Sequence, residues 1–146
     1  MQFSPIEWND IIVLIVANLL NLVIAAVFWC RKKNYKKIEY ALGLVCISML
    51  APLLFVWGFN IAVARDWWTF VLLVPICIYL IVEFIFDYLL KINFRNSRLL
   101  WFYLFFYYIG LWGLIGFAFM VNTTWGYITL ATYFVNLAAT WFAYSK

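Results

Sequence analysis

Of the 146 residues in this chain, 69% are hydrophobic, only 11% are charged, and the net charge is +4. Water-soluble domains are nearer half apolar and a quarter charged, so this composition excludes a soluble globular protein. Basic residues fall in short segments between apolar runs, which excludes nucleic-acid binding because no soluble basic face is left to meet a phosphate backbone. The chain has no histidine and its three cysteines form no Cys-x-x-Cys pair, so we expect no metal site and no cofactor.

Five segments are apolar over the roughly 20 residues that a helix needs to cross a bilayer. They are residues 11–30, 40–64, 67–90, 99–121 and 126–145. Their continuous apolar character excludes the alternating pattern of barrel strands, and the short connections require neighbouring helices to be antiparallel. The sequence therefore predicts an all-α integral membrane protein, with one domain over residues 1–146 that forms an antiparallel bundle of five transmembrane helices.

The distribution of basic residues predicts the orientation of this bundle. Five Lys or Arg lie in residues 31–37 and three in residues 91–98, whereas Arg65 stands alone in the turn between the second and third helices. The positive-inside rule places the first two segments in the cytoplasm, with the N-terminus outside and the C-terminus inside a plasma or inner membrane. The basic loops are expected to contact anionic lipid headgroups, and two partner hypotheses stay open: a second copy, or another membrane subunit. Arg65 is expected to pair with Asp66 as an interfacial anchor or a gate.

Two carboxylic acids, Glu83 and Asp87, lie one helical turn apart in the third apolar segment. If the helix runs to Lys91, Asp87 lies about 6 Å and Glu83 about 12 Å from that end, at 1.5 Å per residue. Lys91 is the i+4 neighbour of Asp87, which predicts a helical ion pair near the headgroups. The i+4 neighbour of Glu83 is Asp87, so we expect Glu83 either to be neutral or to be ionised in a hydrated cavity or beside a cation. Glu83 is therefore the first functional candidate.

Other polar and aromatic side chains fall at comparable depths in the predicted helices. The remaining candidate ligand-binding residues are Asn18, Asn21, Ser48, Tyr79, Tyr108, Trp112 and Asn136, with Tyr107 an alternative to Tyr108. Trp112 is included because it lies deeper than the interfacial belt of other tryptophans and can form the wall of a cavity. Convergence on one pocket depends on the rotation of each helix, so independent interhelical hydrogen bonds are the competing interpretation.

Proline and glycine positions predict local features of three helices. Pro52 and Pro75 each remove a backbone hydrogen bond and are expected to kink the second and third helices. Gly110, Gly113 and Gly116 recur at every third position, a spacing that favours close helix packing over contact with a flat ligand.

These patterns leave three hypotheses for function. The first is a protein that binds or transports a cation, a proton-coupled solute or a lipid-like molecule in a polar pocket centred on Glu83. A structural or assembly subunit of a membrane complex is the alternative. A lipid-modifying enzyme that uses Glu83 and Asp87 as acid and base is less favoured, because the sequence has no phosphate-binding motif and no nucleophile with an adjacent base. Enzymatic activity is therefore left uncertain.

Overall fold

The computed structural model describes residues 6–91 and 97–145, and the regular structure in these ranges is helical throughout. The elements are α1 (Trp8–Lys32), α2 (Lys36–Ser48), α3 (Leu50–Ala62), α4 (Trp68–Val71), α5 (Val74–Glu83), the π-helical segment η1 (Phe84–Leu89), α6 (Leu99–Val121) and α7 (Thr123–Tyr144). The second predicted span corresponds to α2 and α3 together, and the third to α4, α5 and η1. The prediction of an all-α membrane protein is confirmed.

Four helical segments in the described residues are long and apolar enough to cross a membrane. They are Trp8–Lys32, Lys36–Ala62, Trp68–Leu89 and Leu99–Val121. The fifth predicted span, α7, has 22 residues and therefore sufficient length, but its threonines and Asn136 lower its hydropathy. Thr129, Thr132 and Asn136 bond with side chains of α1.

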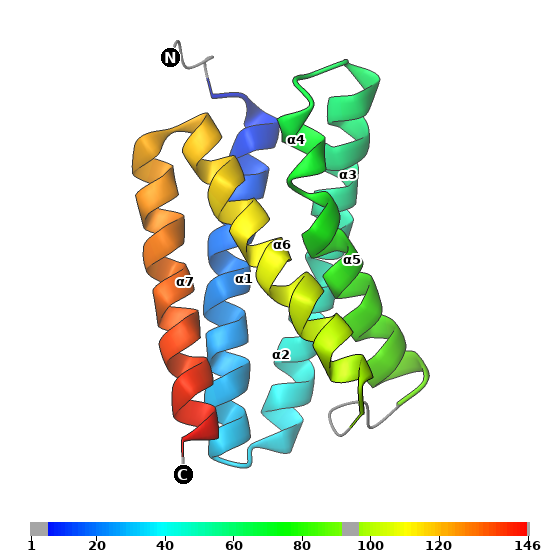
Figure 1. The fold of residues 1–146 in the computed structure, drawn as a ribbon, viewed down its shortest axis with the longest axis vertical. Coiled ribbons are helices and arrows are strands. Elements are labelled where there is room, and N and C mark those ends of the chain that lie inside the picture. The colour runs from blue at the N-terminus through cyan, green and yellow to red at the C-terminus, as the bar shows by residue number, and fades with distance from the viewer. Residues whose placement is uncertain (1–5, 92–96, 146) are drawn as a thin grey trace.

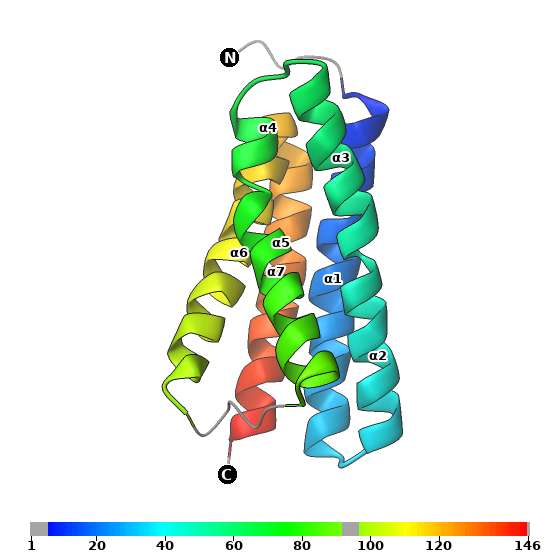
Figure 2. The ribbon, with the colours of Figure 1, turned by 90° about the vertical axis from the view of Figure 1, so that its right-hand side faces the viewer.

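The helices form a bundle in which the connections alternate between two ends (Figures 1 and 2). The N-terminal end carries the start of α1, the α3–α4 connection and the α6–α7 turn. The C-terminal end carries the α1–α2 connection, η1, the start of α6 and the end of α7. The long helix α1 packs against α2, α3, α6 and α7, so it is the element around which the bundle is built.

Both prolines interrupt their helices, as predicted. Pro52 has no N–H for the carbonyl of Ser48, and the helix breaks at Met49, whose N–H turns to the carbonyl of Cys46 at 3.1 Å. Pro75 follows the break between α4 and α5, where the N–H of Leu73 donates to the carbonyl of Phe70 at 3.2 Å. Each break changes the direction of a span, and the second one precedes the segment that carries Glu83.

Two glycines of α6 allow its backbone to touch the third span, at Ile76 in α5 and at Leu72 just before α5. A Cβ at Gly110 would lie 2.9 Å from the Cα of Ile76, and one at Gly113 would overlap the carbonyl oxygen of Leu72. At Gly116 the nearest atom to an added Cβ is a methyl group of Leu72 at 3.7 Å, which is an ordinary contact. The glycine spacing therefore serves close helix packing at Gly110 and Gly113, the use that the sequence favoured.

Candidate functional site

Glu83 and Asp87 are positioned by a change of helix type. Glu83 is the last residue of α5, and Asp87 lies within η1, where the N–H of Leu90 donates to the carbonyl of Ile85 five residues earlier, at 2.8 Å. A residue four positions along a π-helix lies slightly less than one turn away, so the two carboxyl groups share one side of the segment. Single π-turns of this kind occur frequently at functional sites.

The helix does not continue far enough to form the predicted Asp87–Lys91 pair in an i,i+4 arrangement. Helical structure ends at Leu89, and Lys91 has a φ of 50°, outside the helical region. This ending could not be predicted from the sequence, because no glycine or proline follows Asp87 before Lys91.

Both acids line a cavity of about 250 Å³ near the C-terminal end of the bundle, which we call the carboxylate cavity. Its walls come from α1, α2, α5 and η1: Val27, Arg31, Lys36, Glu39, Tyr40, Gly43, Glu83, Asp87 and Tyr88. The structure thus brings Glu83 and Asp87 together with Arg31, Lys36 and Glu39, which sequence reasoning had treated only as parts of a topology signal or had not considered.

The charges in this cavity are partly compensated. The Nε of Arg31 donates to Oε1 of Glu39 at 2.8 Å, and Nη1 of Arg31 donates to the hydroxyl of Tyr144 at 3.2 Å. The described lining also carries the side chains of Glu83, Asp87 and Lys36.

Two tyrosines form the aromatic part of the same wall. The rings of Tyr40 and Tyr88 lie 5.0 Å apart, and the hydroxyl of Tyr88 donates to the backbone carbonyl of Tyr40 at 3.1 Å. Tyr88 reaches α2 only because residue 43 is glycine: a Cβ there would overlap the Tyr88 hydroxyl. Gly43 is therefore a part of the site that the sequence analysis missed.

Glu83 also interacts with two phenols, the buried Tyr79 and the half-buried Tyr103. The hydroxyls of Tyr79 and Tyr103 are 3.1 Å apart, and Glu83 interacts electrostatically with both tyrosines and hydrogen bonds with Tyr103. Tyr79, one of the predicted candidates, therefore belongs to the surroundings of Glu83. Tyr103 was not predicted, because the depth argument selected Tyr107 or Tyr108 as level with Glu83 and placed Tyr103 nearer the end of its span.

Tyr103 also lines a second and larger cavity, which we call the tyrosine cavity. It has a volume of about 430 Å³ and lies between α1, α6 and α7. Its lining residues are Phe28, Arg31, Leu100, Tyr103, Leu104, Tyr107, Tyr108, Thr140 and Tyr144. Arg31 lines both cavities, so the two adjoin at its side chain.

The asparagines near mid-depth form a separate network between α1 and α7. The hydroxyl of Tyr107 donates to Oδ1 of Asn136 at 3.1 Å, and Nδ2 of Asn136 donates to Oδ1 of Asn21 at 3.4 Å. Nδ2 of Asn21 donates to the hydroxyl of Thr132 at 3.2 Å, and that hydroxyl donates to Oδ1 of Asn18 at 2.9 Å. Asn18, Asn21 and Asn136 are thus brought together, but with one another and not with Glu83.

The remaining candidates lie outside the carboxylate cavity. The hydroxyl of Ser48 donates to the carbonyl of Val45 in its own helix, at 2.7 Å, and the residue is exposed on the bundle surface. Trp112 is 61% exposed and packs edge-on against Tyr133. Tyr108 lines the tyrosine cavity.

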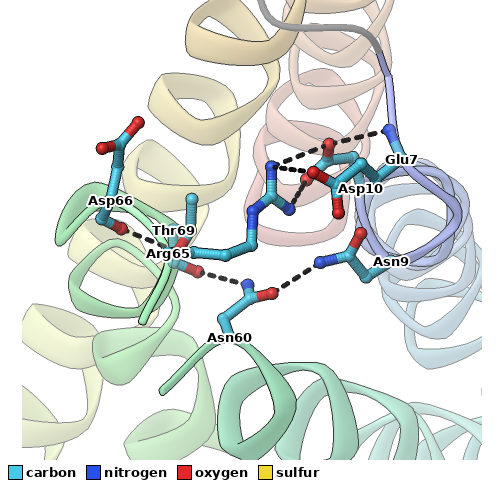
Figure 3. Close-up of polar contacts among 7 residues, drawn as sticks. All are labelled: Glu7, Asn9, Asp10, Asn60, Arg65, Asp66 and Thr69. Carbon is cyan, nitrogen blue, oxygen red and sulfur yellow. Dashed lines mark hydrogen bonds and ion pairs between the residues drawn. The ribbon is translucent and has the colours of Figure 1, made fainter. Parts of the chain in front are cut away.

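A second polar cluster lies at the N-terminal end of the bundle (Figure 3). Instead of pairing with Asp66, Arg65 donates from Nη1 to Oδ1 of Asp10 at 2.8 Å and from Nη2 to Oδ2 of Asp10 at 3.3 Å. The carboxylate of Asp66 points away from Arg65. Beside this pair, Nδ2 of Asn9 donates to Oδ1 of Asn60 at 2.6 Å. The cluster holds α1 against the end of α3 and the α3–α4 connection.

Within residues 6–91 and 97–145, no group of three or more His, Cys, Asp or Glu side chains is arranged to hold a metal ion. The chemistry that the described residues offer is therefore that of carboxylates, phenols, one guanidinium and one lysine ammonium group in adjoining cavities. Compared with known proteins, the chain matches no family model, no curated protein and no solved structure.

Proposed function

We propose that this membrane protein binds a small organic cation in the carboxylate cavity, with Glu83 as the principal ligand group. The observation that carries the proposal is the placement of Glu83 and Asp87 in one wall of a 250 Å³ cavity. Carboxylates balance the charge of a cation, and the rings of Tyr40 and Tyr88 supply π-faces that attract ammonium groups. The volume is slightly smaller than the roughly 300–1,000 Å³ of pockets for drug-sized ligands, which suits a compact ammonium group.

We also propose that the C-terminal end of the bundle faces the cytoplasm of a plasma or inner membrane. The described basic residues of the α1–α2 connection, Arg31, Lys32, Lys33, Lys36 and Lys37, lie at this end, and the positive-inside rule supports the assignment. The ligand would then enter from the cytoplasmic side. A fluorescent protein fused after residue 146 is expected to fluoresce, and an alkaline phosphatase fused there is expected to be inactive. The reverse result would overturn the orientation.

Binding is tested by titrating the purified protein in nanodiscs with tetramethylammonium chloride and measuring heat by calorimetry. We expect saturable binding that an equal concentration of sodium chloride does not reproduce. The change Glu83→Gln keeps the size of the side chain and removes its charge, so it is expected to lower the affinity at least tenfold. Glu7→Gln, the same chemical change at the N-terminal end, is the matched control and is expected to leave the affinity unchanged. Absence of saturable binding, or equal affinity in the Glu83→Gln protein, would overturn the proposal.

A structural or assembly role is the competing proposal, and the network of Asn18, Asn21, Asn136 and Thr132 favours it. These polar groups bond one another across α1 and α7, which is the arrangement expected of side chains that only hold helices together. The same titration separates the two proposals, because a purely structural subunit has no saturable cation site that depends on Glu83.

A further inference from the structure

We infer that the ligand is a cationic amphiphile whose ammonium group occupies the carboxylate cavity and whose alkyl chain occupies the tyrosine cavity. The inference rests on the proposed function and adds the chemical class of the ligand. Three observations carry it. The two cavities adjoin, the second has the apolar lining that an alkyl chain requires, and two residues that line the second cavity are exposed at the surface of the bundle.

The cavities meet at two shared features. Arg31 lines both, held by Glu39 on the side of the carboxylate cavity and by Tyr144 on the side of the tyrosine cavity. Glu83 lines the first cavity and hydrogen bonds with Tyr103, which lines the second. A molecule with its charge beside Glu83 therefore has the tyrosine cavity as the adjoining space for its apolar part.

The tyrosine cavity is lined mostly by hydrocarbon. Phe28, Leu100 and Leu104 provide apolar side chains, and the tyrosines provide ring faces with their hydroxyls at the edges. Its volume of about 430 Å³ falls within the range of small-molecule pockets, which are mostly apolar with a few polar groups that fix orientation. Because Glu39 compensates the charge of Arg31, the guanidinium at the junction is not a strong site for an anion.

The tyrosine cavity lies where α6 and α7 separate, because each of these helices packs against a different neighbour. Gly110 and Gly113 fix α6 against α5, whereas the asparagine and threonine network fixes α7 against α1. The two helices leave their shared turn close together and diverge toward the C-terminal end (Figures 1 and 2). Tyr108 and Tyr144, which line the cavity between them, are 36% and 64% exposed, so an amphiphile can enter sideways from the lipid.

The experiment compares two probes, tetramethylammonium and dodecyltrimethylammonium, on the full chain in nanodiscs. Leu104→Trp replaces a lining side chain with a larger one and narrows the tyrosine cavity. Phe105→Trp is the matched control, because Phe105 is 57% exposed and is absent from the lining of both cavities. Burial of one methylene group strengthens binding about fourfold. A dodecyl probe whose alkyl chain is excluded from the cavity therefore binds far more weakly than one whose alkyl chain is buried. We expect Leu104→Trp to weaken the dodecyl probe at least tenfold without affecting tetramethylammonium, and Phe105→Trp to affect neither.

The outcomes separate this inference from the proposed function. If tetramethylammonium binds and the affinity of the dodecyl probe does not change in Leu104→Trp, the alkyl chain lies in the surrounding lipid. This inference then fails, and the proposed function stands. If neither probe binds the wild-type protein saturably, the proposed function fails with it. Dodecanoate that binds as tightly as dodecyltrimethylammonium would overturn the assignment of a cationic head. Leu100→Trp narrows the same cavity one turn earlier and replaces Leu104→Trp if that variant does not fold.

Discussion

Replacement of Gly110 by alanine is expected to destabilise the bundle by forcing α5 and α6 apart. The added Cβ would lie 2.9 Å from the Cα and 3.1 Å from the backbone nitrogen of Ile76, against about 3.4 Å or more for an ordinary contact. The helices must therefore separate by about half an ångström along this line. Because the neighbouring atoms belong to backbone, no side-chain rotation relieves the overlap, and overpacking of this kind costs about 1–3 kcal/mol.

The matched control is Gly116→Ala in the same helix, where the nearest atom to the added Cβ is a Leu72 methyl group at 3.7 Å. Both changes gain the same helix propensity, about 1 kcal/mol, so the difference between the two variants isolates the packing term. The assay is thermal unfolding in detergent, followed with a thiol-reactive dye that reports exposure of the buried Cys46 and Cys77. At about 3 °C per kcal/mol for a chain of this size, we expect Gly110→Ala to melt roughly 3–9 °C below Gly116→Ala. Equal melting temperatures would refute the close contact of α5 with α6.

Two further predictions use the same assay. Asp10→Asn removes the nearer of the two acidic partners of Arg65, whose side chain is only 11% exposed, and is expected to cost about 1–3 kcal/mol. Asp66→Asn, on the exposed carboxylate of the same turn, is expected to change stability by less than about 0.5 kcal/mol, and equal effects would contradict the assignment of the pair. Asn136→Leu removes the acceptor of the Tyr107 hydroxyl and is expected to cost about 1–3 kcal/mol. Because the two groups bond each other, the double variant with Tyr107→Phe is expected to lose less than the sum of the single variants, and strict additivity would show that the bond contributes nothing.

The features that the sequence predicted are those that depend on one helix at a time. Apolar length gave the five helical segments, because a backbone in lipid has few ways to satisfy its hydrogen bonds. Pro52 and Pro75 gave the two interruptions, because the missing N–H acts locally. The depth of Glu83 and Asp87 in the third span placed both acids near the C-terminal end, where the carboxylate cavity lies.

The features that the sequence did not predict depend on how separate helices face one another. Asp10 and Arg65 are 55 positions apart, so nothing in the "RDWW" turn indicated that Arg65 prefers Asp10 to its neighbour Asp66. The depths of Asn21, Asn136 and Glu83 are comparable, but helix rotation directs the asparagines to one network and Glu83 to another. One feature of the sequence could have indicated the Asp10–Arg65 pair. Arg65 is the lone basic residue at the predicted outer end of the bundle, so it needs an acidic partner, and Asp10 is predicted at the same end.

The hydrogen bonds between α1 and α7 have a consequence for how this chain enters the membrane. They join residues 111 to 115 positions apart, so α7 emerges from the ribosome long after α1 has been inserted. Until α7 arrives, Asn18 and Asn21 face lipid or water, and α7 itself has too little hydropathy to be held in the bilayer as firmly as the other spans. We therefore expect α7 to be stable in the bilayer only when it is docked on α1, whose side chains supply its hydrogen-bond partners.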